Sequence, residues 1–286
     1  MRERIIAVNS NCYHGYSIEE AIAGIKAAGA DMAFYSYHLY DSGATMDLVS
    51  KKKYDAARLS GVNKLRYILQ LHNEMLADFG LPKRKVFLNE LGRARTTGID
   101  GDSLYNAAGL ITYLLAFGCE DEPELYPFPW CTFHNPNLQI SFTQFLLCDD
   151  GSYAMTPNGV AIKMLHSLRG ERLGTTVSEA LSRDSEYCAV AVEDEEGVSL
   201  IVVNTSGETV IGELEIEGMP EGEYVIKGHL CDSFHNNIVT GKTCTGKAID
   251  ETAEAIRKVG ADETFRHFFS LEKNAFNMYK ILKRID

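Results

Sequence analysis

The chain has 286 residues, of which 45% are hydrophobic and 24% charged, and its formal net charge is −12 at pH 7. This length and composition are typical of a soluble globular protein with a sizeable core, built as one large domain or two ordinary ones. The negative charge argues against nucleic acids and anionic membrane surfaces as partners.

The sequence gives no sign of disulfides, a leader or a membrane span. Its seven cysteines are widely spaced, and no CxxC motif occurs. An odd number at such spacing argues against a disulfide framework and against a structural zinc site. The apolar run at residues 5–8 is too short for a signal peptide, and no run of 18 apolar residues occurs. We therefore expect a reduced, cytoplasmic protein.

The first half of the sequence alternates apolar runs with amphipathic segments. The apolar runs predict strands at residues 5–8, 31–40, 86–90 and 124–134. Apolar residues at helical spacing predict helices at about 17–29, 55–79, 104–118 and 156–170. Gly80 and Pro82 end the second of these helices, and two prolines in the fourth strand favour the end or edge of a sheet. Strands alternating with helices indicate parallel strands joined by βαβ crossovers.

The pattern changes after about residue 175. Two strands joined by the turn EEG predict a β-hairpin over residues 187–205, and further strands follow at 209–218, 223–230 and 265–283. A polar insert at about 240–263 carries a predicted short helix at 250–260. We interpret the fold as α/β: a partial or rebuilt (β/α) TIM-type barrel over residues 1–175, followed by a C-terminal antiparallel β-sandwich over residues 176–286.

Candidate site residues lie at the C-terminal ends of the predicted parallel strands. His38 and Tyr40 end one strand, Glu90 ends the next, and Trp130 and His134 lie in or just beyond the last. In a (β/α)8 barrel, side chains at these strand ends face the active site. A Trp ring can stack on a sugar, His and Tyr can bond its hydroxyls, and a carboxylate can attack or stabilise an oxocarbenium-like centre. The set therefore suits a carbohydrate.

Each of these residues also has an ordinary structural explanation. Glu90 can form an ion pair with Arg93 or Arg95 at the end of its strand. His38 can be a hydrogen-bonded core histidine, and large aromatic side chains bury well without any ligand. These explanations stay open beside the functional one.

In chain order, the HxY strand, the Glu strand and the Trp strand resemble strands six to eight of retaining clan A glycoside hydrolases. Residues 155–173 look like the final barrel helix of that clan. Residues 228–237, GHLCDSFHNN, resemble the sandwich segment of the family that contains β-xylosidases and α-iduronidases. The resemblance covers about residues 30–286 and implies no metal and no cofactor.

By this resemblance Glu90 would be the nucleophile of a retaining mechanism. His38 and Tyr40 would orient Glu90 and the sugar, and Trp130 would be the stacking platform. The mechanism also needs a second carboxylate about 5–5.5 Å away, which in the clan is a Glu after Asn on strand four. The other Asn-Glu pair here, at residues 73–74, falls inside a predicted helix.

The resemblance lacks barrel strands one to five, because only about thirty residues precede the HxY strand. The four or five predicted strands cannot close an eight-stranded barrel. Either two chains complete one another or the open edges need another cover, so we expect a homodimer that completes the barrel, or poor solubility.

Residues 5–29 carry a different resemblance, to the first βα unit of sugar-phosphate isomerases and epimerases. The metal-ligand residues of those enzymes come from later strands and are not found here. Three functions are therefore hypothesised: a glycoside hydrolase, a truncated carbohydrate-binding protein that lacks the general acid, and a sugar-phosphate isomerase or epimerase. The first two have a carbohydrate as ligand.

Overall fold

The computed structural model has 286 residues and describes the following part of the chain: residues 20, 23–24, 27, 35–40, 66, 70, 73–74, 76–78, 80–81, 83, 85–93, 102–118, 125–129, 142–147, 150–177, 186–237, 239–240, 243–244, 252–261 and 263–284. The predicted strand at residues 5–8, and with it most of the isomerase-like segment, lies outside this part.

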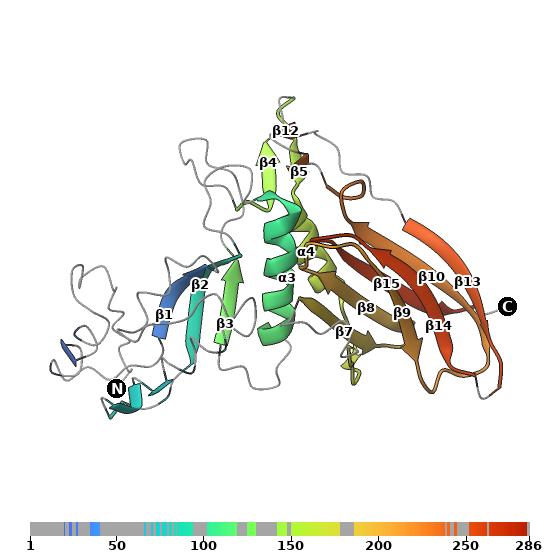
Figure 1. Cartoon of the computed structure of the whole chain (residues 1–286), viewed down its shortest axis with the longest axis horizontal. Coiled ribbons are helices and arrows are strands. Elements are labelled where there is room, and N and C mark those ends of the chain that lie inside the picture. Colours follow the sequence, from blue (N-terminus) through green and yellow to red (C-terminus); the bar gives the residue numbers. More distant parts are fainter. Residues whose placement is uncertain are drawn as a thin grey trace, which may run out of the picture.

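A parallel sheet lies at one end of the molecule (Figure 1). It contains β1 (Tyr35–Tyr40), β2 (Val86–Gly92) and β3 (Leu125–Pro129), in the order β1-β2-β3. Both strand pairs are parallel, as the sequence predicts. The strand with two prolines, β3, lies at the edge of this sheet, which suits a residue that cannot donate a backbone hydrogen bond.

Two helices follow these strands as the sequence predicts. Helix α3 (Leu104–Gly118) packs beside β3, and α4 (Pro157–Ser167) packs against α3. Helix α4 starts at Thr156, whose side chain accepts a hydrogen bond from the Gly159 N–H, with Pro157 in the first turn.

The described residues of the two earlier predicted helices are also helical. The second of these helices ends at Gly80, as predicted. Gly80 has a φ of +62°, its N–H donates to the Ala77 carbonyl, and the Leu81 N–H donates to the Leu76 carbonyl. This pair of bonds is a Schellman motif, for which glycine in the left-handed region is the favoured residue.

The C-terminal region is antiparallel. Its largest sheet has the order β13-β10-β15-β8-β7-β6, and β14 pairs with β9 in a two-stranded sheet. The strands are β6 (Glu171–Arg172), β7 (Tyr187–Glu193), β8 (Gly197–Asn204), β9 (Val210–Ile216), β10 (Gly222–Cys231), β13 (Thr252–Val259), β14 (Phe265–Leu271) and β15 (Phe276–Lys283). Two short hairpins add β4 (Phe145–Leu147) with β5 (Tyr153–Met155), and β11 (Val239–Thr240) with β12 (Thr243–Cys244).

Both faces of the six-stranded sheet are covered. One hydrophobic cluster joins it to α3 and α4 and includes Phe276 and Met278 of β15. A second cluster joins the opposite face to β9 and β14 and includes Tyr279 and Ile281 of β15. Alternate residues of β15 thus pack into two different hydrophobic clusters, one on each face of the sheet. The first cluster crosses the predicted domain boundary at residue 175, and the division into two domains stays a prediction.

The predicted helix at residues 250–260 is wrong. Residues 252–259 form β13, an edge strand that pairs with β10 over its whole length. Ala255 and Val259 face the core, whereas Glu254, Ile256 and Lys258 are exposed, which is the two-residue period of a strand. Backbone pairing with β10 outweighs the helix propensity of Ala, Glu and Lys.

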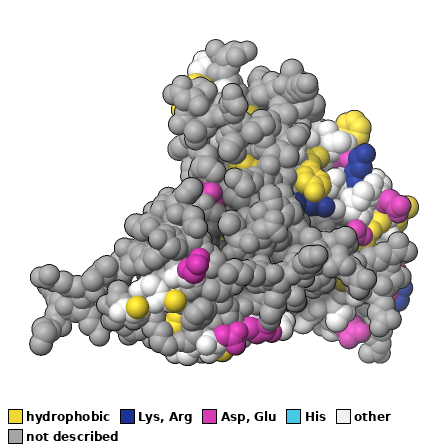
Figure 2. Space-filling model, turned by 60° about the vertical axis from the view of Figure 1, so that its left-hand side comes forward, with side chains coloured by type: hydrophobic (Ala, Val, Ile, Leu, Met, Phe, Trp, Pro, Cys, Tyr) yellow, Lys and Arg dark blue, Asp and Glu magenta, His cyan; other side chains and the backbone are white. Residues whose placement is uncertain are grey.

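The predicted fold is confirmed in part. The structure is rich in strands with few helices, and its sheets are of mixed parallel and antiparallel order. The described parallel strands are three, so the barrel stays a prediction, as does the sandwich. Among the described residues no helix is both long and apolar enough to cross a membrane. Figure 2 shows acidic side chains at several places on the described part of one face, in keeping with the net charge of −12.

The inner face of β14 carries a titratable group, His267. Burial, and secondarily the charge of Arg257, lower the pKa of His267 below its usual 6.5. Its Nδ1 is buried without a hydrogen-bond partner, and its ring packs edge-on against Tyr279 with ring centroids 5.6 Å apart. The folded state therefore disfavours protonation of this side chain.

We expect the stability to fall on acidification because of His267. Below about pH 6.5 the unfolded chain binds a proton that folded His267 resists, so the free energy of unfolding decreases as the pH falls from about 6.5 toward the lowered pKa of the folded state. His267→Phe keeps the ring contact with Tyr279 and removes the titration. Urea unfolding at about pH 7.5 and about pH 5.5 should show a smaller acid loss in this variant than in wild type. His166→Phe, at an exposed position of α4, is the matched control. An unchanged acid loss in His267→Phe contradicts the assignment.

Candidate active site

The C-terminal end of β2 contains a β-bulge at Asn89. Leu88 of β2 pairs with Tyr37 of β1. Glu90 lies two residues beyond Leu88 but pairs with the very next residue of β1, His38. Strand β2 therefore has one residue more than its neighbour at this point, and a bulge of this kind changes the face to which the following side chains point.

The pairing with β3 shows the same extra residue and fixes the faces. Leu88 pairs with Pro127 and Leu91 with Pro129, so three steps along β2 match two along β3. Leu88 and Leu91 are therefore on the same face, and both are buried, with exposed fractions of 0% and 1%. Glu90 points to the opposite face and is half-buried.

Aromatic rings lie on the face that Glu90 shares. The ring of Phe87 stacks on those of Tyr126 and Phe128, with centroids 5.0 Å and 5.9 Å apart. Phe128 lies between the partners of Leu88 and Leu91, so it is opposite the bulge, and it is 47% exposed. A carboxylate at the end of a parallel strand thus stands beside an exposed ring, an arrangement that can hold a sugar against a nucleophile.

The structure describes three of the five predicted site residues, His38, Tyr40 and Glu90. His38 and Tyr40 lie in β1, and the backbone of His38 is in register with Glu90. Trp130 and His134 lie outside the described residues. The strands therefore bring His38 and Glu90 to the same level of the sheet, and the roles of all five residues stay predictions.

The guanidinium of Arg93 bonds to groups other than the Glu90 carboxylate. Its Nη1 donates to the Asn274 side-chain oxygen over 2.8 Å and to the Tyr105 carbonyl over 3.3 Å, and its Nη2 donates to the Thr205 carbonyl over 2.9 Å. It also lies over the Tyr105 ring, 3.8 Å from the centroid. An ion pair between Glu90 and Arg93 is thus not found, and the alternative partner, Arg95, lies outside the described residues.

Arg93 ties the end of β2 to α3 and to the antiparallel region. Its backbone N–H donates to Asn106 Oδ1 over 2.9 Å. A methyl group at Gly109 of α3 would lie 2.6 Å from Arg93 Cβ and Cδ, so a glycine is required there for the side chain to pass. Arg93 therefore fixes the position of the strand end that carries Glu90.

A buried hydrogen-bond network continues from Asn106. Its Nδ2 donates to Asn158 Oδ1 over 3.1 Å, and Asn158 donates to the Thr143 carbonyl over 3.3 Å. Asp102 Oδ1 accepts from both the N–H and the hydroxyl of Thr143, over 2.6 Å and 2.8 Å. Asp102, Asn106, Thr143 and Asn158 are each 1% exposed. This network holds the N-terminal ends of α3 and α4 together, and it engages Asp102, an acid twelve positions after Glu90.

Arg93→Ala is expected to destabilise the protein. The variant leaves the acceptors of Asn274 and Thr205 without their charged donor and should lower the free energy of unfolding by about 2–3 kcal/mol. Chemical denaturation followed by circular dichroism measures this change. The control is Arg169→Ala. Arg169 is exposed, and its Nη1 donates to the carbonyl of the adjacent residue, Leu168. Equal stabilities of the two variants would refute a tethering role for Arg93.

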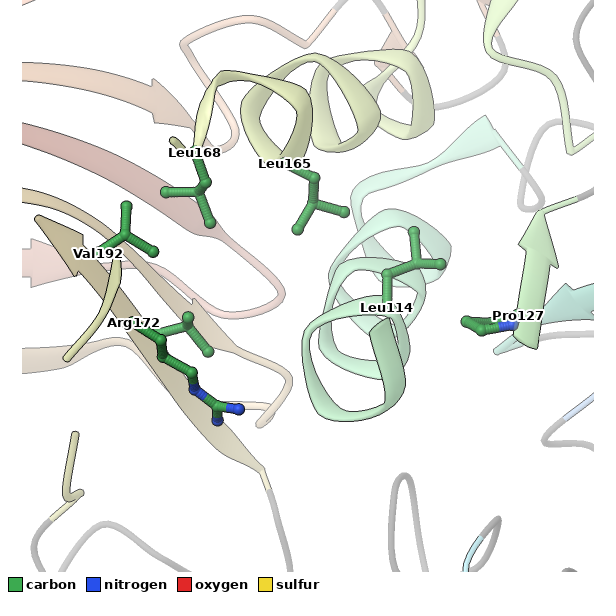
Figure 3. Close-up of a pocket in the computed structure, with 7 residues that line it drawn as sticks. Leu114, Pro127, Leu165, Leu168, Arg172 and Val192 are labelled. Atoms are coloured by element: carbon green, nitrogen blue, oxygen red, sulfur yellow. The ribbon is translucent and has the colours of Figure 1, made fainter. Parts of the chain in front are cut away.

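Described residues line two cavities of about 440 Å³ each, to which Glu90 does not contribute. The first lies between α3, α4, β3 and β7 (Figure 3). It is lined by Leu114, Pro127, Leu165, Leu168, Arg172, Val190 and Val192. Pro127 lines this cavity and has the same face as Leu88, so the cavity lies on the side of the parallel sheet opposite Glu90. Its lining is apolar apart from Arg172.

The second cavity lies where α3 begins. Its lining comes from the first turn of α3, from the loops after β8 and β10, and from the turn between β14 and β15. These residues are Ser103, Leu104, Tyr105, Thr209, Ser233, Asn237, Glu272, Lys273 and Asn274. Arg93, the residue after β2, donates a hydrogen bond to the carbonyl of Tyr105, which lines this cavity, so the cavity lies near the C-terminal end of β2. Within the described residues, no group of three or more His, Cys, Asp or Glu side chains could hold a metal ion.

Sequence reasoning missed Phe87, Tyr126 and Phe128 as neighbours of Glu90. The signal was available for Phe128, which precedes Trp130 by two residues and therefore has the same strand parity. It was not available for Phe87, because only the bulge at Asn89 brings Glu90 to the face of Phe87. Arg93 was weighed only as an ion-pair partner.

No protein-family model and no curated protein matches this sequence. Solved structures do match in fold. A GH39 enzyme from Xanthomonas axonopodis pv. citri aligns with a TM-score of 0.63 and 14% identity, over 93% of this chain and 58% of that one. A monomeric β-xylosidase from Caulobacter crescentus aligns with a TM-score of 0.63 and 14% identity, over 94% and 60%. An α-L-arabinofuranosidase from Thermotoga maritima aligns with a TM-score of 0.57 and 15% identity, over 90% and 54%.

These alignments confirm, at the level of the fold, the resemblance to part of a clan A glycoside hydrolase. Nearly the whole of this chain is used, but it spans only 54–60% of the length of these three structures. This asymmetry agrees with a resemblance that omits the first strands of the barrel.

Proposed function

We propose that the protein is a glycoside hydrolase-like protein that cleaves a β-linked glycoside with retention of configuration, with Glu90 as nucleophile. The observation that carries the proposal is the bulge at Asn89, which turns Glu90 away from the helix-covered face and toward the exposed ring of Phe128. In barrel enzymes the helices lie outside and the active site is at the C-terminal strand ends, which is where Glu90 lies. The fold similarity to a β-xylosidase and other glycoside hydrolases supports the same reaction class.

The chemistry assigned to Glu90 is a two-step displacement. Its carboxylate oxygen attacks the anomeric carbon, the bond to the leaving oxygen breaks, and a second carboxylic acid protonates that oxygen. Water then attacks the glycosyl–Glu90 ester, gives a proton to the second carboxylate and releases the sugar. His38 and Tyr40 would orient the nucleophile and the sugar, with Trp130 as stacking platform and His134 beside it. No cofactor takes part.

The retaining mechanism also needs a second carboxyl group, which acts as general acid and base. Asp102 is a poor candidate because it is 1% exposed and its Oδ1 already accepts two hydrogen bonds from Thr143. We propose that a second copy of the chain supplies it, by adding strands beside β1 and β3, the outer strands of the described parallel sheet. Sedimentation equilibrium that finds a stable, soluble monomer with full hydrolytic activity would exclude this arrangement.

Covalent trapping tests the proposal directly. The protein is incubated with dinitrophenyl 2-deoxy-2-fluoro-β-glycosides of several sugars, which form long-lived glycosyl–enzyme esters with retaining enzymes. Mass spectrometry of the digested protein should find the fluorosugar on the peptide that contains residues 86–92. Labelling of any other carboxylate, or release of dinitrophenol without labelling of this peptide, would refute Glu90 as nucleophile.

A second function is favoured by the hydrogen bonds of Asp102. Its carboxylate is buried and bonded to Thr143, which makes it a poor general acid, so the described residues can form a sugar platform without an acid partner. The protein would then bind a carbohydrate without cleaving it. Sugar binding that is equal in wild type and Glu90→Gln, with no turnover of any aryl glycoside, would favour this function. The sugar-phosphate isomerase hypothesis rests on residues 5–29, and a metal requirement for activity would favour it.

A further inference from the structure

We propose that the cavity at the start of α3, called here the α3 cavity, is a second binding site for a neutral oligosaccharide. The inference rests on the proposed function, because it takes the ligand to be a longer part of the carbohydrate that reaches Glu90. The cavity volume of about 440 Å³ is within the range of small-molecule sites. Its nine lining residues are the ones given above.

The α3 cavity is rich in groups that bond hydroxyls. Three lining residues carry hydroxyls and two carry amides: Ser103, Thr209, Ser233, Asn237 and Asn274. The carboxylate of Glu272 and the ammonium of Lys273 contribute opposite charges, so the net charge of the lining is zero. A neutral ligand with many hydroxyls therefore finds donors and acceptors here, whereas an ionic ligand meets one like charge for each opposite charge.

Tyr105 provides a flat surface in the α3 cavity. Its side chain is 44% exposed although the Arg93 guanidinium lies 3.8 Å from the ring centroid. The cation holds the ring in place on one side, so the exposed remainder can stack on the apolar face of a pyranose. Phe234, in the loop that also supplies Ser233 and Asn237, is 72% exposed and offers a second ring.

The wall formed by residues 232–237 is held by hydrogen bonds within the chain. Asp232 Oδ1 accepts hydrogen bonds from the Phe234 and His235 N–H groups, each over 2.8 Å. The Ser233 N–H donates to Glu272 Oε2 over 3.1 Å and so joins this loop to the turn after β14. A wall that is already ordered loses little conformational entropy on binding, which favours affinity.

Arg93 links the α3 cavity to Glu90. The two residues are three positions apart, a length of chain that spans at most about 11 Å. The side chain of Arg93 then reaches Tyr105 at the cavity. One oligosaccharide of a few units can therefore contact Glu90 with its end and the α3 cavity with its interior units.

The test is a titration of the full-length, ¹⁵N-labelled protein with xylohexaose, followed by amide resonances. We expect shifts at residues 103–105, Ser233 and Lys273. Tyr105→Ala should weaken the apparent Kd at least about tenfold, and Tyr105→Phe should retain the wild-type value because the ring is kept. Phe268→Ala, which removes a ring 63% exposed on the outer face of β14, is the matched control and should change nothing. Hexagalacturonic acid, equally long but anionic, should bind more weakly.

Thr209→Trp provides a second variant, since it fills the α3 cavity from an exposed position without touching the Arg93 contact. It should abolish the shifts even if Tyr105→Ala fails to fold. Absence of shifts at the cavity, shifts that persist in both variants, or tighter binding of the anionic probe would overturn the inference. Binding at the cavity that survives in Glu90→Gln, with no hydrolysis by wild type, would overturn the proposed function alone. Hydrolysis that depends on Glu90 without shifts at the cavity would overturn the further inference alone.

Discussion

Glu90→Gln should abolish turnover of aryl glycosides by a protein that remains folded. Glutamine keeps the size and the hydrogen-bonding capacity of the side chain but cannot form the glycosyl ester. The loss expected for a missing nucleophile is about 10³-fold or more in kcat/KM, which corresponds to about 4 kcal/mol of transition-state stabilisation. The release of nitrophenol or dinitrophenol from a panel of aryl β-glycosides measures it.

The controls separate the chemistry from the fold. Glu74→Gln, at an exposed position of the helix that precedes β2, changes the same functional group and should leave turnover intact. Glu90→Gly in the presence of azide should release a glycosyl azide of inverted configuration, because the small anion replaces the missing carboxylate. If Glu90→Gln turns over substrate as fast as wild type, Glu90 is not the nucleophile and is a structural residue at the end of β2.

Phe276→Ala should cause the largest loss of stability among single core substitutions of β15. Its side chain is 0% exposed and belongs to the cluster that joins the six-stranded sheet to α3 and α4. Truncation of a buried Phe removes its transfer free energy and leaves a cavity, so the free energy of unfolding should fall by about 3–5 kcal/mol. Guanidinium denaturation measures the change.

The same experiment tests whether α3 and α4 unfold together with the antiparallel sheet. Since Phe276 contributes to a cluster with members from both, circular dichroism at helical wavelengths and tyrosine fluorescence should shift together in Phe276→Ala. Phe268→Ala removes the same side chain from a position that is 63% exposed and should cost little. Two separate transitions, with only the fluorescence affected, would mean that the two regions unfold independently.

The sequence predicts most elements of this structure because their patterns are local. Gly80, Thr156 with Pro157, and the turn before Gly197 each mark a boundary through their own backbone preferences, and each boundary is where it was predicted. The strand Thr252–Val259 was predicted as a helix because its residues favour helices. Its pairing with β10 joins residues 23 to 37 positions apart and is not visible locally.

The sequence singles out Glu90 as a candidate site residue, but it does not predict the orientation of Glu90 or its neighbours. Glu90 stands out because a carboxylate follows a buried apolar run. Its orientation depends on how β2 pairs with β1 and β3, and its neighbour Phe128 comes from another strand. Arg93 could not be assigned either, since Asn274 lies 181 positions away along the chain. The strand pairing and long-range contacts that decide such features follow from tertiary packing.

The bulge at Asn89 has a consequence for how this gene can change. In-frame loss of codon 89 would remove the bulge and leave Leu88, Glu90 and Leu91 in regular alternation. Glu90 would keep its place opposite His38 and its face of the sheet, and Leu91 would stay on the buried face with Leu88. In descendants of this gene, loss of residue 89 is therefore expected to be tolerated more readily than loss of Leu88 or Leu91, whose side chains are buried.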